Sequence, residues 1–266
     1  MTGCARKPEL VDALKRGGRQ LARGRLERFW RSISEAGDNI FKPGRMLLPA
    51  RGPNVLLIIL VSMLLLQSTT VQSQELRREQ AVQRLSHASA QARREATVRL
   101  GEVGIMADVP ALVKVLRDSD EDTRQHAEQA IWRIWARSGN QKVDALYQTG
   151  IEQMNAGDLQ QAIVTFTRII EMKPDFAEGW NKRATLYFLV GDLHKSLADC
   201  DEVMKRNPYH FGALSGYALI YTRLEYYDRA LEYSRRALEV NPNLDGVRQN
   251  IDLLEHLIEQ RRKQMI

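Results

Sequence analysis

The sequence predicts an all-α fold, a right-handed solenoid of helical hairpins, and three observations support this. Residues 143 to 244 divide into three segments of 34 residues. A large apolar residue stands fourth in each segment, at Leu146, Trp180 and Leu214. Each segment also ends in a proline that follows a polar residue, at Pro174, Pro208 and Pro242. Because a hairpin of helices cannot bury its own apolar face, successive units must stack around a continuous core.

The interior of each unit predicts two helices and one turn. A polar turn separates the helices, at Gly157-Asp158, Gly191-Asp192 and Glu225-Tyr226. Small residues stand where the first helix crosses the second, at Gly150, Ala184 and Ala218. A second set of small residues falls where the second helix packs back, at Ala162, Ser196 and Ala230. The prediction for Cys200 is burial as a small hydrophobic residue at such a packing position.

This pattern resembles the tetratricopeptide repeat (TPR) family, of the exported bacterial type. The matching residues are Ala162, Phe166 and Pro174 in residues 143–176; Trp180, Tyr187 and Pro208 in residues 177–210; and Tyr221, Ala230, Ala237 and Pro242 in residues 211–244. The departures include Thr149, Arg183, Cys200 and Ser234. The resemblance implies a helical solenoid that binds other proteins and carries no catalytic site. Trp180 is then expected to be largely buried between the helices of its unit.

Residues 245–266 predict a capping helix after the third unit. Ile251, Leu254, Leu257 and Ile258 recur at helical spacing, with charged residues between them. A solenoid needs such a helix to cover its last apolar face.

Residues 76–138 predict further helices before the repeats. Val109-Pro110 is typical of a helix start, since proline in a first turn costs no hydrogen bond. An acidic loop, Asp118-Ser119-Asp120, follows, and aspartate before a helix caps it. The segment is similar to HEAT-like repeats. Trp132 and Trp135 lie on one face of its last helix, where we expect core packing; a docking surface is the alternative.

The positive charge of the chain is confined to its N-terminal segment. The whole chain has a net charge of +6. Residues 1–54 hold 12 Lys/Arg against 5 Asp/Glu, a net of +7, which leaves −1 for the remainder. Nucleic-acid binding needs clustered basic residues on the folded surface, so the sequence predicts no nucleic-acid partner for the solenoid.

Residues 55–73 predict the apolar and cleavage regions of a signal peptide. Val55 to Leu66 is an apolar run of 12 residues. A membrane span needs about 20 apolar residues. Two alternatives remain because 54 residues precede the run. One is an uncleaved membrane anchor over 55–71 with the basic segment in the cytoplasm, and the other is an organelle-targeting extension. A start at Met46 would give a signal peptide of ordinary form.

The sequence contains none of the motifs that we searched for as signs of catalysis. Its five histidines are scattered singly, without metal-ligand spacing. Nucleotide-binding and serine-hydrolase signatures are missing. We therefore expect no enzyme, no metal and no cofactor.

The resemblance implies a protein partner in the concave groove lined by the first helices of the units. The groove positions most suited to contact it are Tyr147, Asn155, Asn181, Thr185, Phe188 and Arg223. Clamping of a C-terminal carboxylate, as in the chaperone-binding class, is disfavoured because Tyr147, Ile151, Gly212 and Gly216 replace basic and Asn residues. The expected function is an exported, periplasmic or secreted scaffold that holds a peptide or helix of a partner protein. The alternative is a membrane-anchored assembly factor with its solenoid across the membrane.

We expect the mature protein to begin near Gln74, because the apolar run is short for an anchor and the small residue Ser73 precedes this position. N-terminal sequencing of the protein from its native cells measures this. Recovery of peptides covering Arg6 to Arg31 from the envelope fraction would contradict it.

Overall fold

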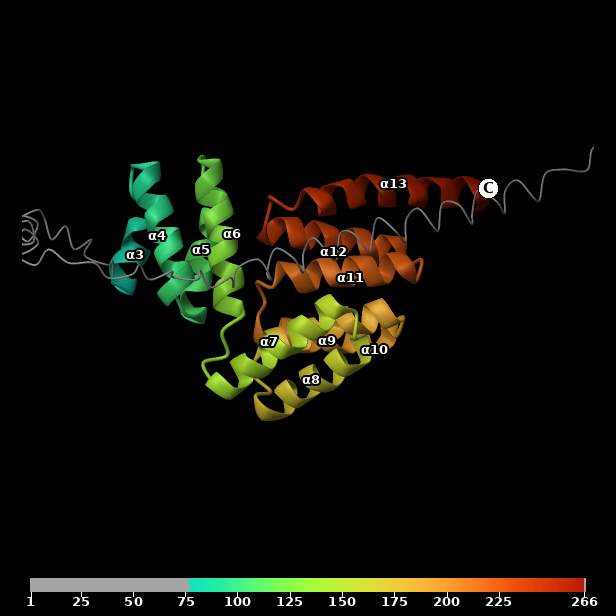
Figure 1. The fold of residues 1–266 in the computed structure, drawn as a ribbon. Helices are drawn as coiled ribbons and strands as arrows, with labels where there is room; N and C mark the ends of the chain where they lie inside the picture. Colours follow the sequence, from blue (N-terminus) through green and yellow to red (C-terminus); the bar gives the residue numbers. More distant parts are fainter. Residues whose placement is uncertain (1–76, 266) are drawn as a thin grey trace, which may run out of the picture.

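The computed structural model describes residues 77–265, and every regular element within them is helical (Figure 1). The predicted segments 1–54 and 55–73 lie outside the described residues. No helix of the described part is long and apolar enough to cross a membrane. The elements are α3 (Arg78–Arg84), α4 (Ala90–Val103), η1 (Met106–Asp108), α5 (Val109–Val115), α6 (Glu121–Trp135), α7 (Gln141–Ala156), α8 (Leu159–Met172), α9 (Ala177–Val190), α10 (Leu193–Arg206), α11 (Phe211–Arg223), α12 (Tyr227–Val240) and α13 (Asp245–Met265).

Helices α3 to α6 form a bundle with its own apolar core. Leu100, Leu112 and Ile131 are fully buried there. The predicted helix start at Pro110 is confirmed, with the proline in the first turn of α5. The predicted cap at Asp120 is confirmed as well, since its side chain accepts a hydrogen bond from the Thr123 backbone at 2.9 Å.

The three hairpins are α7–α8, α9–α10 and α11–α12, and local chemistry explains their turns. Gly157 and Gly191 end α7 and α9 in the left-handed region, at φ of 82° and 89°. Glu225 takes the same conformation in the third turn, with φ 61°, which is unfavourable for a residue with a Cβ. The close crossing predicted at Gly150 is confirmed, because a Cβ there would lie 2.7 Å from the Phe166 ring.

Buried asparagines shape the exits from the second and third hairpins. The side chain of Asn207 accepts a hydrogen bond from the Tyr209 backbone at 3.2 Å. Asn241 accepts one from the Asn243 backbone at 3.0 Å. The asparagine side chain thus closes a turn before the next helix. The proline within this turn has no N–H that would need a hydrogen-bond acceptor. This accounts for the Asn-Pro punctuation of the sequence.

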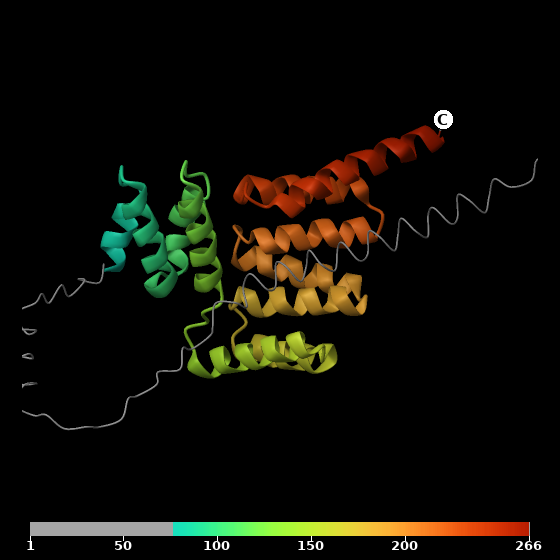
Figure 2. The ribbon, with the colours of Figure 1, turned by 45° about the horizontal axis from the view of Figure 1, so that its top comes forward.

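Helix α13 covers the last hairpin, as predicted. Val247 is buried in a cluster with Leu214 and Ala237 of the third hairpin, and Leu254 is fully buried. Most of its other face is polar and exposed. Figure 2 shows α13 continuing beyond the end of α12.

The N-terminal bundle packs beside the third hairpin and does not stack below the first (Figures 1 and 2). Trp132 and Trp135 of α6 are buried and form edge and tilted contacts with Phe211, at centroid distances of 5.2 and 4.9 Å. A Cβ on Gly212 would lie 2.7 Å from the Trp132 ring. The structure therefore confirms core packing for the two tryptophans over the alternative of an open docking surface.

Hydrogen bonds hold the edge of the same junction. The Asn243 side chain donates to the Leu116 carbonyl at 2.8 Å. It also accepts from the Arg124 guanidinium at 3.1 Å. The loop before α13 is therefore tied to the loop before α6, and the bundle and the solenoid share one interface.

The expectation that Trp180 is largely buried is wrong. Its ring is half-buried and lies between two guanidinium groups, Arg183 at 5.1 Å and Arg206 at 4.8 Å from the centroid. Its Nε1 donates to the Pro174 carbonyl at 2.9 Å. The ring is thus covered by long cationic side chains at the edge of the unit and not by core residues.

Substitution of Trp132 and of Trp180 should distinguish a tryptophan in the core from one at the edge of a repeat unit. We expect Trp132→Ala to lower the free energy of unfolding by about 3–5 kcal/mol, because it empties a buried aromatic site. Trp180→Ala should cost about 1–2 kcal/mol, for one hydrogen bond and partly exposed cation–π contacts. Chemical denaturation of both variants measures the difference. Equal losses would contradict the assignment of Trp132 as the junction core.

Candidate protein-binding groove

The stacking of the first helices fixes which side chains face the groove. Leu186 of α9, Ile220 of α11 and Leu254 of α13 occupy the same place in successive units, and all three are fully buried. They mark the side of each helix that packs on the preceding hairpin. The residue before each, Thr185, Leu219 and Leu253, is turned by about 100° toward the concave side.

The predicted partner-binding residues differ in accessibility. Asn155 is exposed near the end of α7, and Tyr147 and Arg223 are half-buried. Thr185 and Phe188 are buried on α9. Asn181 is also buried, with 4% of its surface exposed. Contact of these six residues with a partner stays a prediction, although the structure gives Asn181 an internal partner that the sequence did not suggest.

That internal partner belongs to a buried polar cluster centred on Glu178. One carboxylate oxygen accepts from the Asn181 amide at 3.2 Å and lies 2.8 Å from His210 Nε2. The other oxygen lies 3.6 Å from Lys182 Nζ and 3.4 Å from the Tyr147 hydroxyl, which donates to it. Helices α7, α9 and α11 therefore meet at one carboxylate.

His210 connects this cluster to the N-terminal bundle. Its Nδ1 accepts a hydrogen bond from the Ala213 backbone at 3.0 Å, so it caps the start of α11. We assign the ring hydrogen to Nε2, which then donates to Glu178. The His210 ring also stacks on the Trp135 ring of α6, with the two ring centroids 4.3 Å apart. Helix α6 thus walls off the groove at the N-terminal ends of α9 and α11.

The charge of Glu178 is held by its partners. Complete burial acts to raise the pKa of this carboxyl, but the hydrogen bond from His210 and the charge of Lys182 outweigh it and hold the pKa below its ordinary value. The carboxylate is therefore ionised and internally neutralised at neutral pH. It contributes little negative potential to the open part of the groove.

The open part of the groove lies toward the C-terminal ends of the first helices. Asn155, Leu189, Arg223 and Leu257 occupy equivalent places there, and all are at least partly exposed. The Arg223 guanidinium donates to the Phe188 carbonyl at 2.9 Å and lies 5.3 Å from the Phe188 ring centroid. We call these four side chains the lip row.

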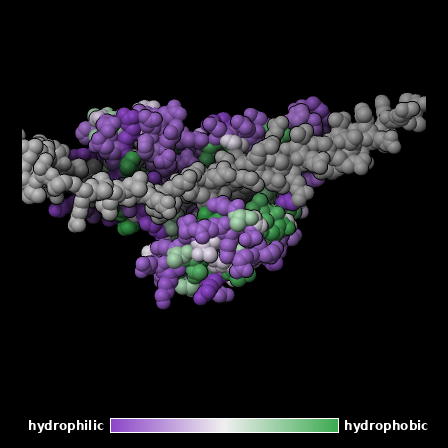
Figure 3. Space-filling model, in the orientation of Figure 1, coloured by the Kyte–Doolittle hydropathy of each residue, from purple (hydrophilic) through white to green (hydrophobic). Residues whose placement is uncertain are grey.

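Hydrophobic side chains gather at this end of the solenoid. Figure 3 shows them near the turn from α9 into α10. Val190 at that turn is 39% exposed, and Leu189 and Leu193 are partly buried beside it. Sequence reasoning gave Leu189 a groove position but placed neither Val190 nor Leu193 in the groove. If the 34-residue spacing is continued past residue 244, Leu253 and Leu257 also fall at groove positions.

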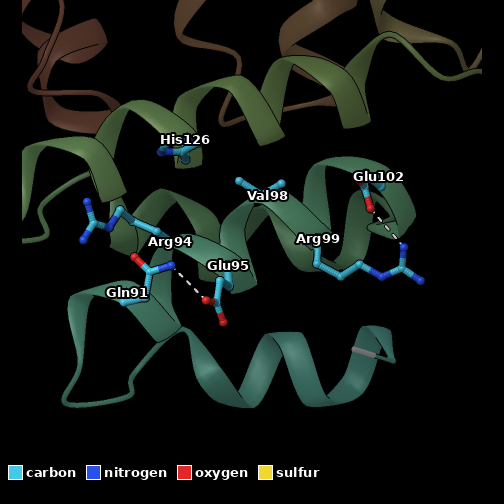
Figure 4. A pocket seen from close by; sticks show the side chains of 7 residues that line it. All are labelled: Gln91, Arg94, Glu95, Val98, Arg99, Glu102 and His126. Carbon is cyan, nitrogen blue, oxygen red and sulfur yellow. Dashed lines mark hydrogen bonds and ion pairs between the residues drawn. The ribbon is translucent and has the colours of Figure 1, made fainter. Parts of the chain in front are cut away.

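An open cleft of about 430 Å³ lies along α4 and α6 of the N-terminal bundle (Figure 4). Its charged and polar side chains engage partners nearby. Gln91 donates to Glu95, and Arg99 to Glu102, both at 2.9 Å. Arg94 pairs with Asp122 at 2.7 Å. This arrangement is that of a solvated helix surface and does not converge on a ligand.

Two further expectations concern reactive groups. Within residues 77–265, no three His, Cys, Asp or Glu side chains are placed to hold a metal ion. Cys200 is buried as predicted, and its desolvation raises the pKa of the thiol well above the ordinary value. A thiol in this state is a poor nucleophile.

Comparisons with known proteins support the predicted repeat. Residues 212–244, within the third hairpin and the loop that follows it, match the family model of the tetratricopeptide repeat. A TPR repeat-containing protein of Rhizobium etli is 36% identical over 104 residues, which are 39% of this chain and 51% of the relative. The chain thus matches about half the length of this curated relative. These matches support the interpretation of the sequence as a TPR repeat protein.

Solved structures give a similar arrangement of helices. The first TPR domain of Spaghetti (RPAP3), bound to the HSP90 peptide SRMEEVD, has a TM-score of 0.44 and 21% identity, covering 45% of this chain and 94% of that one. The Sgt2 TPR domain from Aspergillus fumigatus has a TM-score of 0.45 and 21% identity, covering 47% of this chain and 83% of that one.

Substitution of the central carboxylate should produce a pH-dependent loss of stability. Glu178→Gln keeps the shape but removes the charge, and we expect it to cost about 1.5–3 kcal/mol near neutral pH. The folded-state pKa is lowered, so this stabilisation is present above the ordinary pKa of 4.5 and is lost as the pH falls through the lowered value. The difference from the unsubstituted protein should therefore shrink on acidification.

Urea unfolding at neutral and acidic pH measures this difference. Glu171→Gln, at an exposed position of α8, is the matched control and should be close to neutral at both. A penalty for Glu178→Gln that stays constant with pH would contradict the charge assignment.

Proposed function

We propose that the chain is a non-catalytic protein-interaction module that holds a segment of a partner protein in its concave groove. The observation that carries this proposal is the lip row. It presents apolar and hydrogen-bonding side chains together on adjacent rigid helices, at the end of the groove opposite to α6. Helical grooves of this kind take a peptide or an amphipathic helix through apolar anchors and a few orienting polar groups.

In this proposal the predicted contact residues have different roles, either in direct contact with the partner or in support of the groove. Asn155 and Arg223 orient polar groups of the partner, because both reach the accessible side of the groove. Tyr147 contributes its half-buried ring. Phe188 and Thr185 form the floor, and Asn181 supports that floor through Glu178. The open part of the groove thus favours a partner segment with a continuous apolar side.

We also propose that the module works outside the cytoplasm, as a periplasmic or secreted protein. This rests on the signal-like sequence of residues 55–73. In the membrane-anchored alternative the same groove would act beside the membrane, held there by residues 55–71. Sequencing the N-terminus of the native protein distinguishes the two.

Site-specific photocrosslinking tests the groove. A benzoylphenylalanine at Asn155 or Leu189 should form adducts with one set of partner proteins in native cells, because both positions lie on the proposed contact surface. Mass spectrometry of the adducts identifies the partners. The matched control is the same probe at Arg168, which is exposed on α8, the second helix of the first hairpin. Identical adducts from all three positions, or adducts from Arg168 alone, would contradict the proposal.

A further inference from the structure

We propose that in a chain that retains its apolar run, Val55 to Leu66, this run lies in the groove as a helix and closes it. The mature chain expected to begin near Gln74 lacks the run, so its groove is open to a partner. This inference rests on the proposed function and adds to it the regulation of the same site. The run lies outside the described residues, so its place is inferred from the groove, from its length and from the chain that joins the two.

The groove contains a row of buried side chains that lie off the packing side of their helices. Ile151, Thr185 and Leu219 stand at equivalent places on α7, α9 and α11, and 4%, 3% and 1% of their surfaces are exposed. Leu253 has the same place on α13 and is 41% exposed, so this place is not in itself a core position. We call the three buried residues the inner row. A stack of helices leaves its concave side open, so the burial of the inner row indicates a further cover.

Helix α11 shows the same feature on all its sides. Residues 211–220 are buried without exception, and the helix has no charged side chain before Arg223. A helix that is apolar all round is typical of one that is covered all round. Helices α9, α10, α12 and α6 pack on α11. On its concave side Ser215 and Leu219 present a small and an apolar side chain, which a further helix can approach closely.

The inner part of the groove favours an occupant without charge. Its carboxylate, Glu178, already has His210 and Lys182 as partners. A charge brought in beside the inner row would have to be buried, which is costly without a partner. Residues 52–74 contain no charged residue, and residues 55–66 are aliphatic except for Ser62 and Met63. The run therefore has the composition that the inner row requires.

The length of the run matches the width of the inner row. Its 12 residues form a helix about 18 Å long, at a rise of about 1.5 Å per residue. Three packed helices with axes about 8–10 Å apart span about 16–20 Å from the first axis to the third. A helix of the run laid across α7, α9 and α11 thus covers the inner row from end to end.

The chain between the run and the described fold is long enough to allow this placement. Residues 67–77 lead to α3, and 11 extended residues span up to about 36 Å. Helices α3, α4 and α6 pack in succession, and α6 borders the groove at His210. Three helix spacings of about 8–10 Å make about 24–30 Å. The run therefore reaches the groove while the bundle stays folded.

Photocrosslinking within the full chain tests the inference. A benzoylphenylalanine at Leu189, in the lip row beside the inner row, should form an adduct with residues 55–66 when the chain is purified without detergent. Mass spectrometry of the digested protein locates the adduct, and its yield should not change on dilution because both ends belong to one chain. The matched control is the same probe at Arg168, exposed on α8, which should give no such adduct.

Three results would overturn the inference. One is the absence of an adduct with the run, or an equal yield from Leu189 and Arg168. Another is an adduct whose yield falls on dilution, because the run of a second copy would then occupy the groove. The third is a full chain that is monodisperse only in detergent, because the run would then be exposed and would suit a membrane.

Matched variants of the run test its apolar contact. Leu60→Asp should lower the yield of the adduct about tenfold or more, since it would bury a carboxylate in the groove. Ser68→Asp, just after the run, should leave the yield unchanged. Cooperative thermal unfolding of both variants shows that both fold. An unchanged yield for Leu60→Asp would contradict the inference.

The same probe separates this inference from the proposed function. If Leu189 captures partner proteins in native cells but never the run in the full chain, the groove binds proteins and its own chain does not close it. Only this inference then fails. If Leu189 captures the run but no partner in native cells, the groove serves its own chain and the proposed function fails.

Discussion

The rest of the structure depends on the contact that each first helix makes with the preceding hairpin. Leu186, Ile220 and Leu254 are fully buried at equivalent places of α9, α11 and α13. Because each helix has its rotation fixed by one such side chain, the residues beside it are committed to the groove or to the opposite side. The groove-facing surface and the core are therefore set by the same contact, and neither can shift without the other.

The tryptophan junction adds a second constraint, which acts between segments far apart in the chain. Trp135 stacks on His210, and His210 both caps α11 and contacts Glu178 of α9. The N-terminal bundle is thereby coupled to two hairpins through one imidazole. Loss of this imidazole would remove a hydrogen bond to the buried Glu178 carboxylate, which is destabilising. The bundle thus acts as a structural wall of the groove.

The repeat period allowed the hairpins to be predicted because their determinants are local. The turns at Gly157 and Gly191 and the close helix crossing at Gly150 follow from conformation and size. The burial of Trp180 was predicted wrongly because Arg183 and Arg206 pack against its ring. Sequence position alone does not show whether an aromatic ring contacts core residues or arginine side chains.

The polar cluster could not be predicted for a related reason. Asn181 and Glu178 stand at groove positions, where solvent exposure is the ordinary expectation. Their burial depends on the approach of α6 and on His210, a contact between distant segments that leaves no periodic signal. In the sequence His210 is an isolated histidine before a helix, and nothing there indicates that it also contacts Glu178.

Burial decides how much of the formal charge of the groove rows acts at their surface. The groove rows of α9 and α11 contain one acidic and one basic residue, so their formal charges cancel. Glu178 is enclosed by His210, Lys182 and Asn181. A buried charge that is already paired contributes little potential at the surface of the protein. The Glu178 carboxylate therefore stabilises the packing of three helices and adds little negative potential to the groove.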